Sequence, residues 1–263
     1  MIYTRAGQRI VKPSMAECTA LGLGLGMGFG GGASAAPWSP LNVTSAAIKL
    51  WLRADKGTTI ATGVSAWADQ SGTGDANKNA TQATGSMQPT LTASDAAYNN
   101  QATLHFSAAA QQLLATGTWA SSFPVPRTIF VIGHGSSASA MFVEGLTSVD
   151  RTSMQLSAGL DLQTYASQLL VSTALVSSPC VMAATFTSDA TAAIFVSALT
   201  ANVTGPTGGY TTTGLTIGAY PAPSNWLTGT IAEIAGYAGI LSAPDFAAFM
   251  GYAGTRYGLT IGA

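Results

Sequence analysis

The sequence predicts an all-β domain with one helix near its C-terminal end, carried behind an extended N-terminal arm. From residue 48 onward, short β-branched or apolar runs are separated by turns rich in Gly, Ser, Asn and Pro, which is typical of a sandwich or barrel. The last stretch instead has apolar residues at helical spacing. Residues 1–47 have no core pattern and close with a break signal, Pro37-Trp38-Ser39-Pro40. We therefore expect an arm over 1–47 and a domain over 48–263.

Ten short runs are predicted to be strands, because each is apolar or β-branched and is bounded by turn residues. No repeat of 20–50 residues is visible, so nothing in the chain indicates a repeat architecture. The predicted strands cover residues 48–53, 103–106, 128–133, 140–143, 154–156, 160–165, 181–186, 192–196, 215–217 and 228–237.

A single helix is predicted over residues 242–257. Ser242 with Asp245 three residues later resembles a capping box, and Pro244 falls in the first turn, where proline is tolerated. Gly258 is a suitable C-terminal stop. One apolar stripe follows the start, formed by Phe246, Phe249, Met250, Ala253 and Tyr257. We expect this stripe to pack on the sandwich.

The arm contains an alternating stretch in which every second residue is glycine. An extended chain would place Leu21, Leu23, Leu25, Met27 and Phe29 on one side and glycine on the other. A helix is disfavoured there, because each interior glycine costs about 1 kcal/mol relative to alanine. We expect the five side chains to anchor the protein to another chain or to a neighbouring copy, by burial and by pairing with a sheet edge. The alternative is that the arm folds back on its own domain.

Composition excludes several classes of function. Charged residues make up 8% of the chain, against roughly 25% in ordinary globular proteins, and the formal net charge is −1. Without a basic patch, nucleic-acid binding is not expected. No solidly apolar run of about 18 residues is present, so no membrane-spanning helix is expected. Cys18 and Cys180 indicate neither a disulfide nor a zinc site, and they leave the redox compartment open.

Several short motifs follow one another along the domain: LWLRAD at 50–55, VSAWADQSG at 64–72, NATQ at 79–82, QPTL at 88–91, ATLHF at 102–106, RTIFV at 127–131, LTGTIAEI at 227–234, and residues 241–242 and 252–259. Taken in this order, they resemble the concanavalin-A-like/laminin-G jelly rolls of bacterial surface proteins and phage virion proteins. The resemblance covers roughly residues 48–261 and implies a two-sheet antiparallel jelly-roll sandwich in which Trp51 and Trp67 belong to the core. The fold does not specify a function.

The carboxylates do not form a catalytic pattern. Glycosidases need two carboxylates flanking the scissile bond, and enzymes of this fold usually carry them as a cluster on one strand. Glu144 and Asp150 are the closest pair in a strand–loop region, and their surroundings indicate an ordinary loop. Glu233 stands alone, and the resemblance implies that it accepts structural hydrogen bonds from backbone or hydroxyl groups. We expect no catalytic residues and no enzymatic activity.

The histidines and one acidic segment are expected to have structural roles. His105 and His134 are the histidines of the chain; the first lies in a predicted strand and the second near a strand end, so both are expected to be structural. The segment 69–77 superficially resembles a calcium loop, yet Ala80 stands where an EF-hand needs its bidentate glutamate. A turn in which Asp69 caps backbone amides is favoured over calcium. We therefore expect no cofactor and no metal.

Three aromatic residues lie in loops rich in Gly, Pro and Thr. Exposed aromatic rings on a sandwich can stack on sugar rings, so Tyr210, Tyr220 and Trp226 are candidate glycan-binding residues. Alternatively, Trp226 covers the edge of the sandwich.

Together these observations favour a non-enzymatic structural or binding protein. The first hypothesis is a tailed-phage virion surface protein, such as a capsid decoration, head-fibre or tail-associated protein, anchored by its arm to other virion proteins or to neighbouring copies. It would then be a homo-oligomer or part of a larger assembly. The alternative is a secreted bacterial carbohydrate-binding, lectin-like module, which would be extracellular and would bind a cell-surface glycan.

Overall fold

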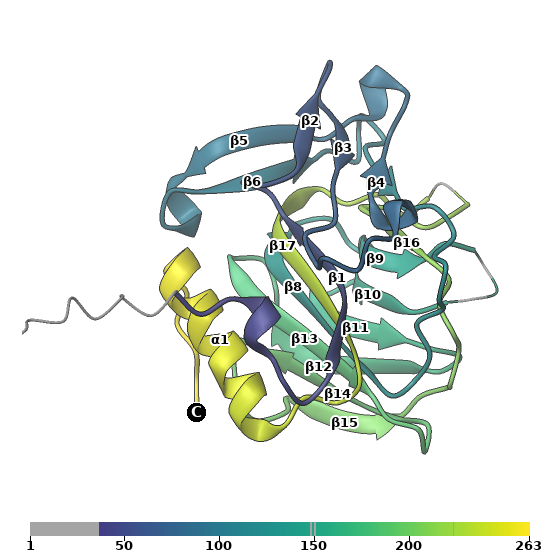
Figure 1. The fold of residues 1–263 in the computed structure, drawn as a ribbon, viewed down its shortest axis with the longest axis vertical. Helices are drawn as coiled ribbons and strands as arrows, with labels where there is room; N and C mark the ends of the chain where they lie inside the picture. The colour runs from purple at the N-terminus through teal and green to yellow at the C-terminus, as the bar shows by residue number, and fades with distance from the viewer. Residues whose placement is uncertain (1–36, 148, 150, 223) are drawn as a thin grey trace, which may run out of the picture. The chain divides into compact units, whose positions relative to one another are not determined.

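Two antiparallel sheets and one helix form the folded domain (Figure 1), which confirms the predicted sandwich with a C-terminal helix. The computed structural model describes residues 37–263 except 148, 150 and 223. The domain runs from Trp38 to Ala263. The predicted arm residues Leu21, Leu23, Leu25, Met27 and Phe29 lie outside the described residues.

The first sheet, called sheet A, has eight strands in the described residues. Its centre is β17, which pairs with β8 on one side and with β6 and β1 on the other. In spatial order the strands are β15 (Val203–Pro206), β14 (Thr191–Val196), β13 (Cys180–Phe186), β8 (Arg127–Gly135), β17 (Gly229–Ala238), β6 (Gln101–Phe106) and β5 (Thr90–Asp95), with β1 (Ala47–Arg53) beside β17.

The second sheet, called sheet B, has nine strands in the part of the chain that the structure describes. Six of them are only two to four residues long, and the longest, β12, lies at one edge of the sheet. In spatial order they are β12 (Leu169–Leu175), β11 (Asp161–Tyr165), β10 (Ser153–Leu156), β9 (Met141–Gly145), β16 (Leu215–Ile217), β7 (Leu114–Ala115), β4 (Ala80–Thr81), β3 (Val64–Trp67) and β2 (Thr58–Ile60).

The helix α1 (Ala243–Tyr257) begins and ends where the sequence predicts. The Ser242 side chain accepts a hydrogen bond from the Asp245 backbone N–H, and Gly258 closes the helix in the left-handed conformation, with φ of 68°. The Asp245 carboxylate does not complete a capping box. It accepts from the backbone N–H groups of Thr44 and Ser45, at 3.1 and 2.8 Å, and so ties the start of the helix to the segment that leads into β1.

The central strands of sheet A, β8, β13 and β17, are buried on both faces. In β8, Ile129 and Val131 belong to the core between the sheets, while Phe130 and Ile132 belong to a second core under α1. The Phe130 ring stacks on Phe249 of the helix, with centroids 3.8 Å apart. Because both faces are covered, these central strands have nearly continuous apolar sequences, and sequence analysis predicts them.

The two predicted core tryptophans are both buried, but they lie in different cores. Trp67 belongs to the core between the sheets, and Trp51 faces the helix from β1. Cys180 is buried in β13, where its thiol donates to the Gly133 carbonyl at 3.4 Å, and burial raises its pKa to about 12. Among the described residues, the helix is too short and too polar to cross a membrane.

Candidate functional site

The outer face of sheet B differs from that of sheet A, because α1, the α-helix of the described domain, packs on sheet A. In β10 and β11, Leu156 and Leu162 point into the core between the sheets. Side chains alternate along a strand, so Gln155 and Gln163 point to the outer face, directly opposite each other. Tyr165 follows two residues later on the same face, and all three are half-buried.

A buried glutamate and a partly exposed arginine lie on this face. Glu144 is in β9, opposite Thr216 of β16, and its side chain has no exposed surface. Arg151 donates to one carboxylate oxygen, Oε2, through Nε at 3.2 Å and Nη2 at 2.9 Å. The other oxygen, Oε1, accepts from the backbone N–H groups of Gly145 and Thr152, each at 2.9 Å. Both carboxylate oxygens therefore have partners within the protein.

Two tyrosine rings hold the arginine head in place. The Arg151 guanidinium carbon lies 4.1 Å from the Tyr165 ring centroid and 5.1 Å from that of Tyr220. Contacts at these distances are cation–π interactions, worth about 0.5–2 kcal/mol each. The Arg151 side chain is 22% exposed. One polar and aromatic patch is thus formed by strand β11, the segment before β10 and the loop after β16. We call Glu144, Arg151, Tyr165 and Tyr220 the arginine cluster.

Electrostatics keep the arginine cluster close to neutral. Burial raises the pKa of Glu144 above its ordinary value, while the Arg151 guanidinium and two backbone N–H groups oppose that shift. The same ion pair raises the pKa of Arg151, so the guanidinium stays charged. The pair holds Arg151 in one orientation and leaves one edge of its head group to face outward.

Sequence reasoning places only one residue of the arginine cluster among the glycan candidates. That residue is Tyr220. Tyr210 lies in a different loop, with its side chain exposed and its carbonyl accepting from the buried Arg127 at 2.8 Å. Trp226 shares the Gly218–Leu227 loop with Tyr220 but is half-buried, and its carbonyl accepts from Ser137. No ring contact joins these three aromatics within the described residues.

The interpretation of Glu144 as part of an ordinary loop is wrong. It is a strand residue that the register turns away from the core, and the loop that follows supplies its counter-ion seven residues later. Asp150, the other member of the predicted pair, lies outside the described residues. Sequence analysis also misses Arg151, Tyr165, Gln155 and Gln163. A usable signal was the strict alternation of Asp161, Gln163 and Tyr165 with buried residues, which is typical of a strand with one solvated face.

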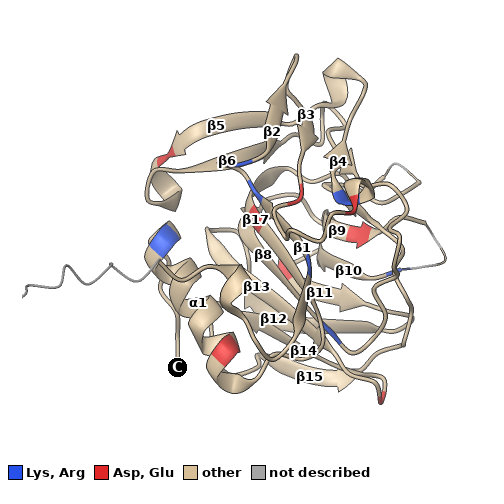
Figure 2. Cartoon of the chain, in the orientation of Figure 1, with Lys and Arg blue, Asp and Glu red and all other residues tan. Residues whose placement is uncertain are grey.

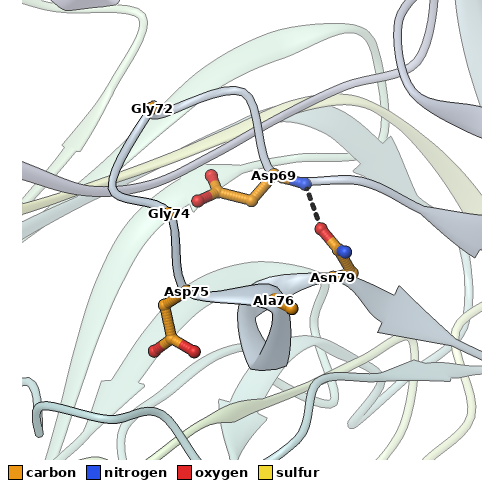
Figure 3. A pocket seen from close by; sticks show the side chains of 6 residues that line it. All are labelled: Asp69, Gly72, Gly74, Asp75, Ala76 and Asn79. Carbon is orange, nitrogen blue, oxygen red and sulfur yellow. Dashed lines mark hydrogen bonds between the residues drawn. The ribbon is translucent and has the colours of Figure 1, made fainter.

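The segment from Asp69 to Asn79 lines a pocket of about 350 Å³ (Figure 3). Asp69 Oδ1 accepts from the backbone N–H groups of Trp51 and Ser71, at 2.8 and 3.0 Å. The Asp75 carboxylate accepts from the backbone of Asn77 and Ala120. These bonds confirm that Asp69 caps backbone amides, as the sequence predicts. Among the described residues, no cluster of three acidic, histidine or cysteine side chains offers a metal site.

The remaining titratable candidates have structural partners. The Glu233 carboxylate accepts from Trp51 Nε1 at 2.6 Å, Tyr257 OH at 2.6 Å and Tyr252 OH at 2.9 Å. This confirms that Glu233 accepts hydrogen bonds from hydroxyl groups, and the indole of Trp51 is a third donor. His134 lies near the end of β8, and its Nδ1 is 2.8 Å from the hydroxyl of Tyr98.

His105 occupies the outer face of β6 and is exposed. Its Nε2 lies 3.3 Å from the Thr230 hydroxyl, a weak hydrogen bond that fits the expected structural role.

No protein-family model and no curated protein sequence matches the chain. Solved structures do resemble it. Domain 4 of an extracellular arabinanase from Geobacillus stearothermophilus, solved in complex with arabinotriose, is 11% identical with a TM-score of 0.50; the match covers 80% of this chain and 100% of that domain. The receptor-binding domain of botulinum neurotoxin type G is 9% identical with a TM-score of 0.53, over 79% of this chain and 51% of that one.

A structure of botulinum neurotoxin type C, whose cell entry depends on two ganglioside molecules, is 11% identical with a TM-score of 0.50, and the match again covers 79% of this chain and 51% of that one. The chain thus spans the whole arabinanase domain and about half of each neurotoxin chain. At these identities the similarities show the fold, a jelly-roll-like β-sandwich.

Proposed function

We propose that this chain is a non-catalytic glycan-binding module whose site is the outer face of sheet B. The observation that carries the proposal is the arginine cluster, where an arginine fixed by a buried carboxylate lies against two tyrosine rings on a face that no described helix covers. Half-exposed aromatic rings beside oriented hydrogen-bond donors match the mixed apolar and hydroxylated surface of a sugar. The arabinotriose and ganglioside ligands of the structural neighbours support the same ligand class.

The absence of catalysis is part of the proposal. A glycosidase acid or nucleophile must reach the scissile bond, and its two carboxylates must flank that bond. Glu144 has no exposed surface, and Arg151 and two backbone N–H groups occupy both of its oxygens. Incubating the full chain with polymeric arabinan and β-glucan should release no reducing sugar. Turnover that is lost in Glu144→Gln would contradict this part of the proposal.

Binding is tested by titrating the full chain with oligosaccharides in a calorimeter. Tyr220→Ala should lower the affinity about tenfold or more, because truncation of a central aromatic anchor typically costs more than 1 kcal/mol. Leu199→Ala is the matched control: it removes an apolar side chain that is 42% exposed in the connection between β14 and β15 of sheet A. Equal losses in both variants, or no loss in Tyr220→Ala, would count against the site.

A virion surface role is the second candidate, and the distribution of charge favours it. The chain has few charged residues, and Figure 2 shows them scattered over the domain. Several are also buried, namely Arg53, Lys78, Arg127, Glu144 and Glu233. A surface so poor in charge suits many copies packed side by side. Finding the full chain in purified phage particles, and its loss after deletion of residues 1–36, would support this role; a chain found only free in the medium would contradict it.

A further inference from the structure

Charge on the outer face of sheet B is already matched without a ligand. Arg151 is the only lysine or arginine between residues 141 and 175 of the sequence, and Glu144 neutralises it through two hydrogen bonds. Asp161 lies on the same face of β11 as Gln163, two residues away. Among the described residues, the Ser157 hydroxyl is the one side-chain partner of its carboxylate, at 3.1 Å. An acidic ligand would therefore meet a compensated cation and a nearby carboxylate, an arrangement that repels it.

Neutral hydrogen-bonding groups are present on the same face. Gln155 Nε2 donates to Gln163 Oε1 at 3.2 Å, across β10 and β11. This bond uses one group of each amide and leaves the Gln155 oxygen and the Gln163 nitrogen to face a ligand. An amide donor beside an amide acceptor is complementary to sugar hydroxyl groups, which both donate and accept.

The groups also form a row. Gln163 and Tyr165 are two residues apart on one face of β11, which separates them by about 7 Å along the strand. Arg151 lies against Tyr165, and Tyr220 also contacts Arg151. The row that runs from the glutamine pair through Tyr165 to Arg151 is longer than one sugar ring.

We infer that the ligand of this face is an uncharged oligosaccharide of at least two sugar units, with one unit against the tyrosines and Arg151 and the next against Gln155 and Gln163. The inference rests on the proposed function and adds the charge and the length of the ligand. Sugars that carry a carboxylate, such as uronic and sialic acids, are excluded by the charge balance around Arg151.

The test is a calorimetric titration of the full chain with neutral mono-, di- and trisaccharides of arabinose, glucose and galactose. Trigalacturonic acid and sialyllactose are the charged counterparts. At least one neutral trisaccharide should bind about tenfold or more tightly than its monosaccharide, and more tightly than either charged probe, at low ionic strength. Gln163→Ala should reduce trisaccharide affinity about fivefold while leaving monosaccharide affinity unchanged; Gln155→Ala serves as the second variant.

The outcomes separate the inference from the proposed function. Tighter binding of a charged probe that is lost in Tyr220→Ala would overturn the inference and leave the proposed function standing. Equal affinity for monosaccharide and trisaccharide, or trisaccharide binding unchanged in both glutamine variants, would overturn the inference on length. If no sugar of either class binds, or if binding survives in Tyr220→Ala, the proposed function itself fails.

Discussion

Each sheet buries a glutamate under its outer face, and the two glutamates are satisfied in different ways. On sheet A, Glu233 receives three hydrogen bonds from neutral donors, the indole of Trp51 and the hydroxyls of Tyr252 and Tyr257. Two of these donors belong to α1, so the carboxylate helps to fix the helix on the sheet. A buried acceptor with three aromatic donors, sealed by a helix, is a structural arrangement.

On sheet B, Glu144 instead forms an ion pair with Arg151. Arg151 is partly exposed and contacts two tyrosine rings that are themselves half-buried. The carboxylate orients the guanidinium and cancels its charge, but it does not close the surface. The comparison shows that one residue type under two equivalent faces can support either a sealed interface or an open, preorganised surface.

The largest expected loss of stability comes from removing the Glu233 carboxylate between sheet A and α1. Glu233→Ala leaves two buried donors, on Trp51 and Tyr257, and the half-buried hydroxyl of Tyr252 without their acceptor, and each unsatisfied buried donor costs about 1–3 kcal/mol. We expect the free energy of unfolding in urea to fall by about 3 kcal/mol or more. Glu233→Gln keeps one acceptor oxygen and should lose less. A loss below about 1 kcal/mol in Glu233→Ala would show that the donors find other partners and that the network does not hold the helix.

A smaller effect on stability is expected from the Glu144–Arg151 ion pair on the outer face of sheet B. A double-mutant cycle with Glu144→Gln and Arg151→Gln should give a coupling energy of about 1–2 kcal/mol, between the values typical of exposed and of buried ion pairs. Urea unfolding of the four proteins measures it. A coupling energy near zero would mean that the pair does not hold Arg151, and the preorganisation of the surface would have no support.

The pH dependence of stability tests the burial of Glu233 on sheet A. Burial raises the pKa of Glu233 above its ordinary value of 4.5. The folded chain therefore keeps this proton at pH values where the unfolded chain has lost it, and the free energy of unfolding falls as pH rises from about 4.5 through the raised pKa. Glu233→Gln removes this contribution, so its stability should decline less over that window. Parallel curves for the two proteins would contradict a raised pKa.

Most of the fold follows from patterns in the sequence, and the reason is burial. Strands covered on both faces, such as β8, read as apolar runs, and the helix carries its cap and stop residues in order. The strands that sequence analysis misses are short or lie at edges: β2, β3, β4 and β7 have two to four residues, and β5, β12 and β15 lie at the edges of their sheets. Such strands depend on tertiary pairing rather than on local preference.

The site is harder to predict, because it is assembled across the sequence. Tyr220 is recognisable as an aromatic residue in a turn-rich loop, but its partner Arg151 comes from a segment 69 residues earlier and Tyr165 from a different strand. Glu144 reads as a loop residue because nothing local shows which way its strand faces. Only the register of β9 against β16 places that side chain under Arg151.

The central claim is that the outer face of sheet B takes an uncharged oligosaccharide, and mapping of ligand-induced NMR shifts on the full chain tests it most directly. The account predicts that titration with the tightest-binding neutral trisaccharide of the calorimetric panel shifts the amide resonances of β10, β11 and the Gly218–Leu227 loop and the ring resonances of Tyr165 and Tyr220. Saturable shifts confined to the Asp69–Asn79 loop, or to sheet A, would contradict it.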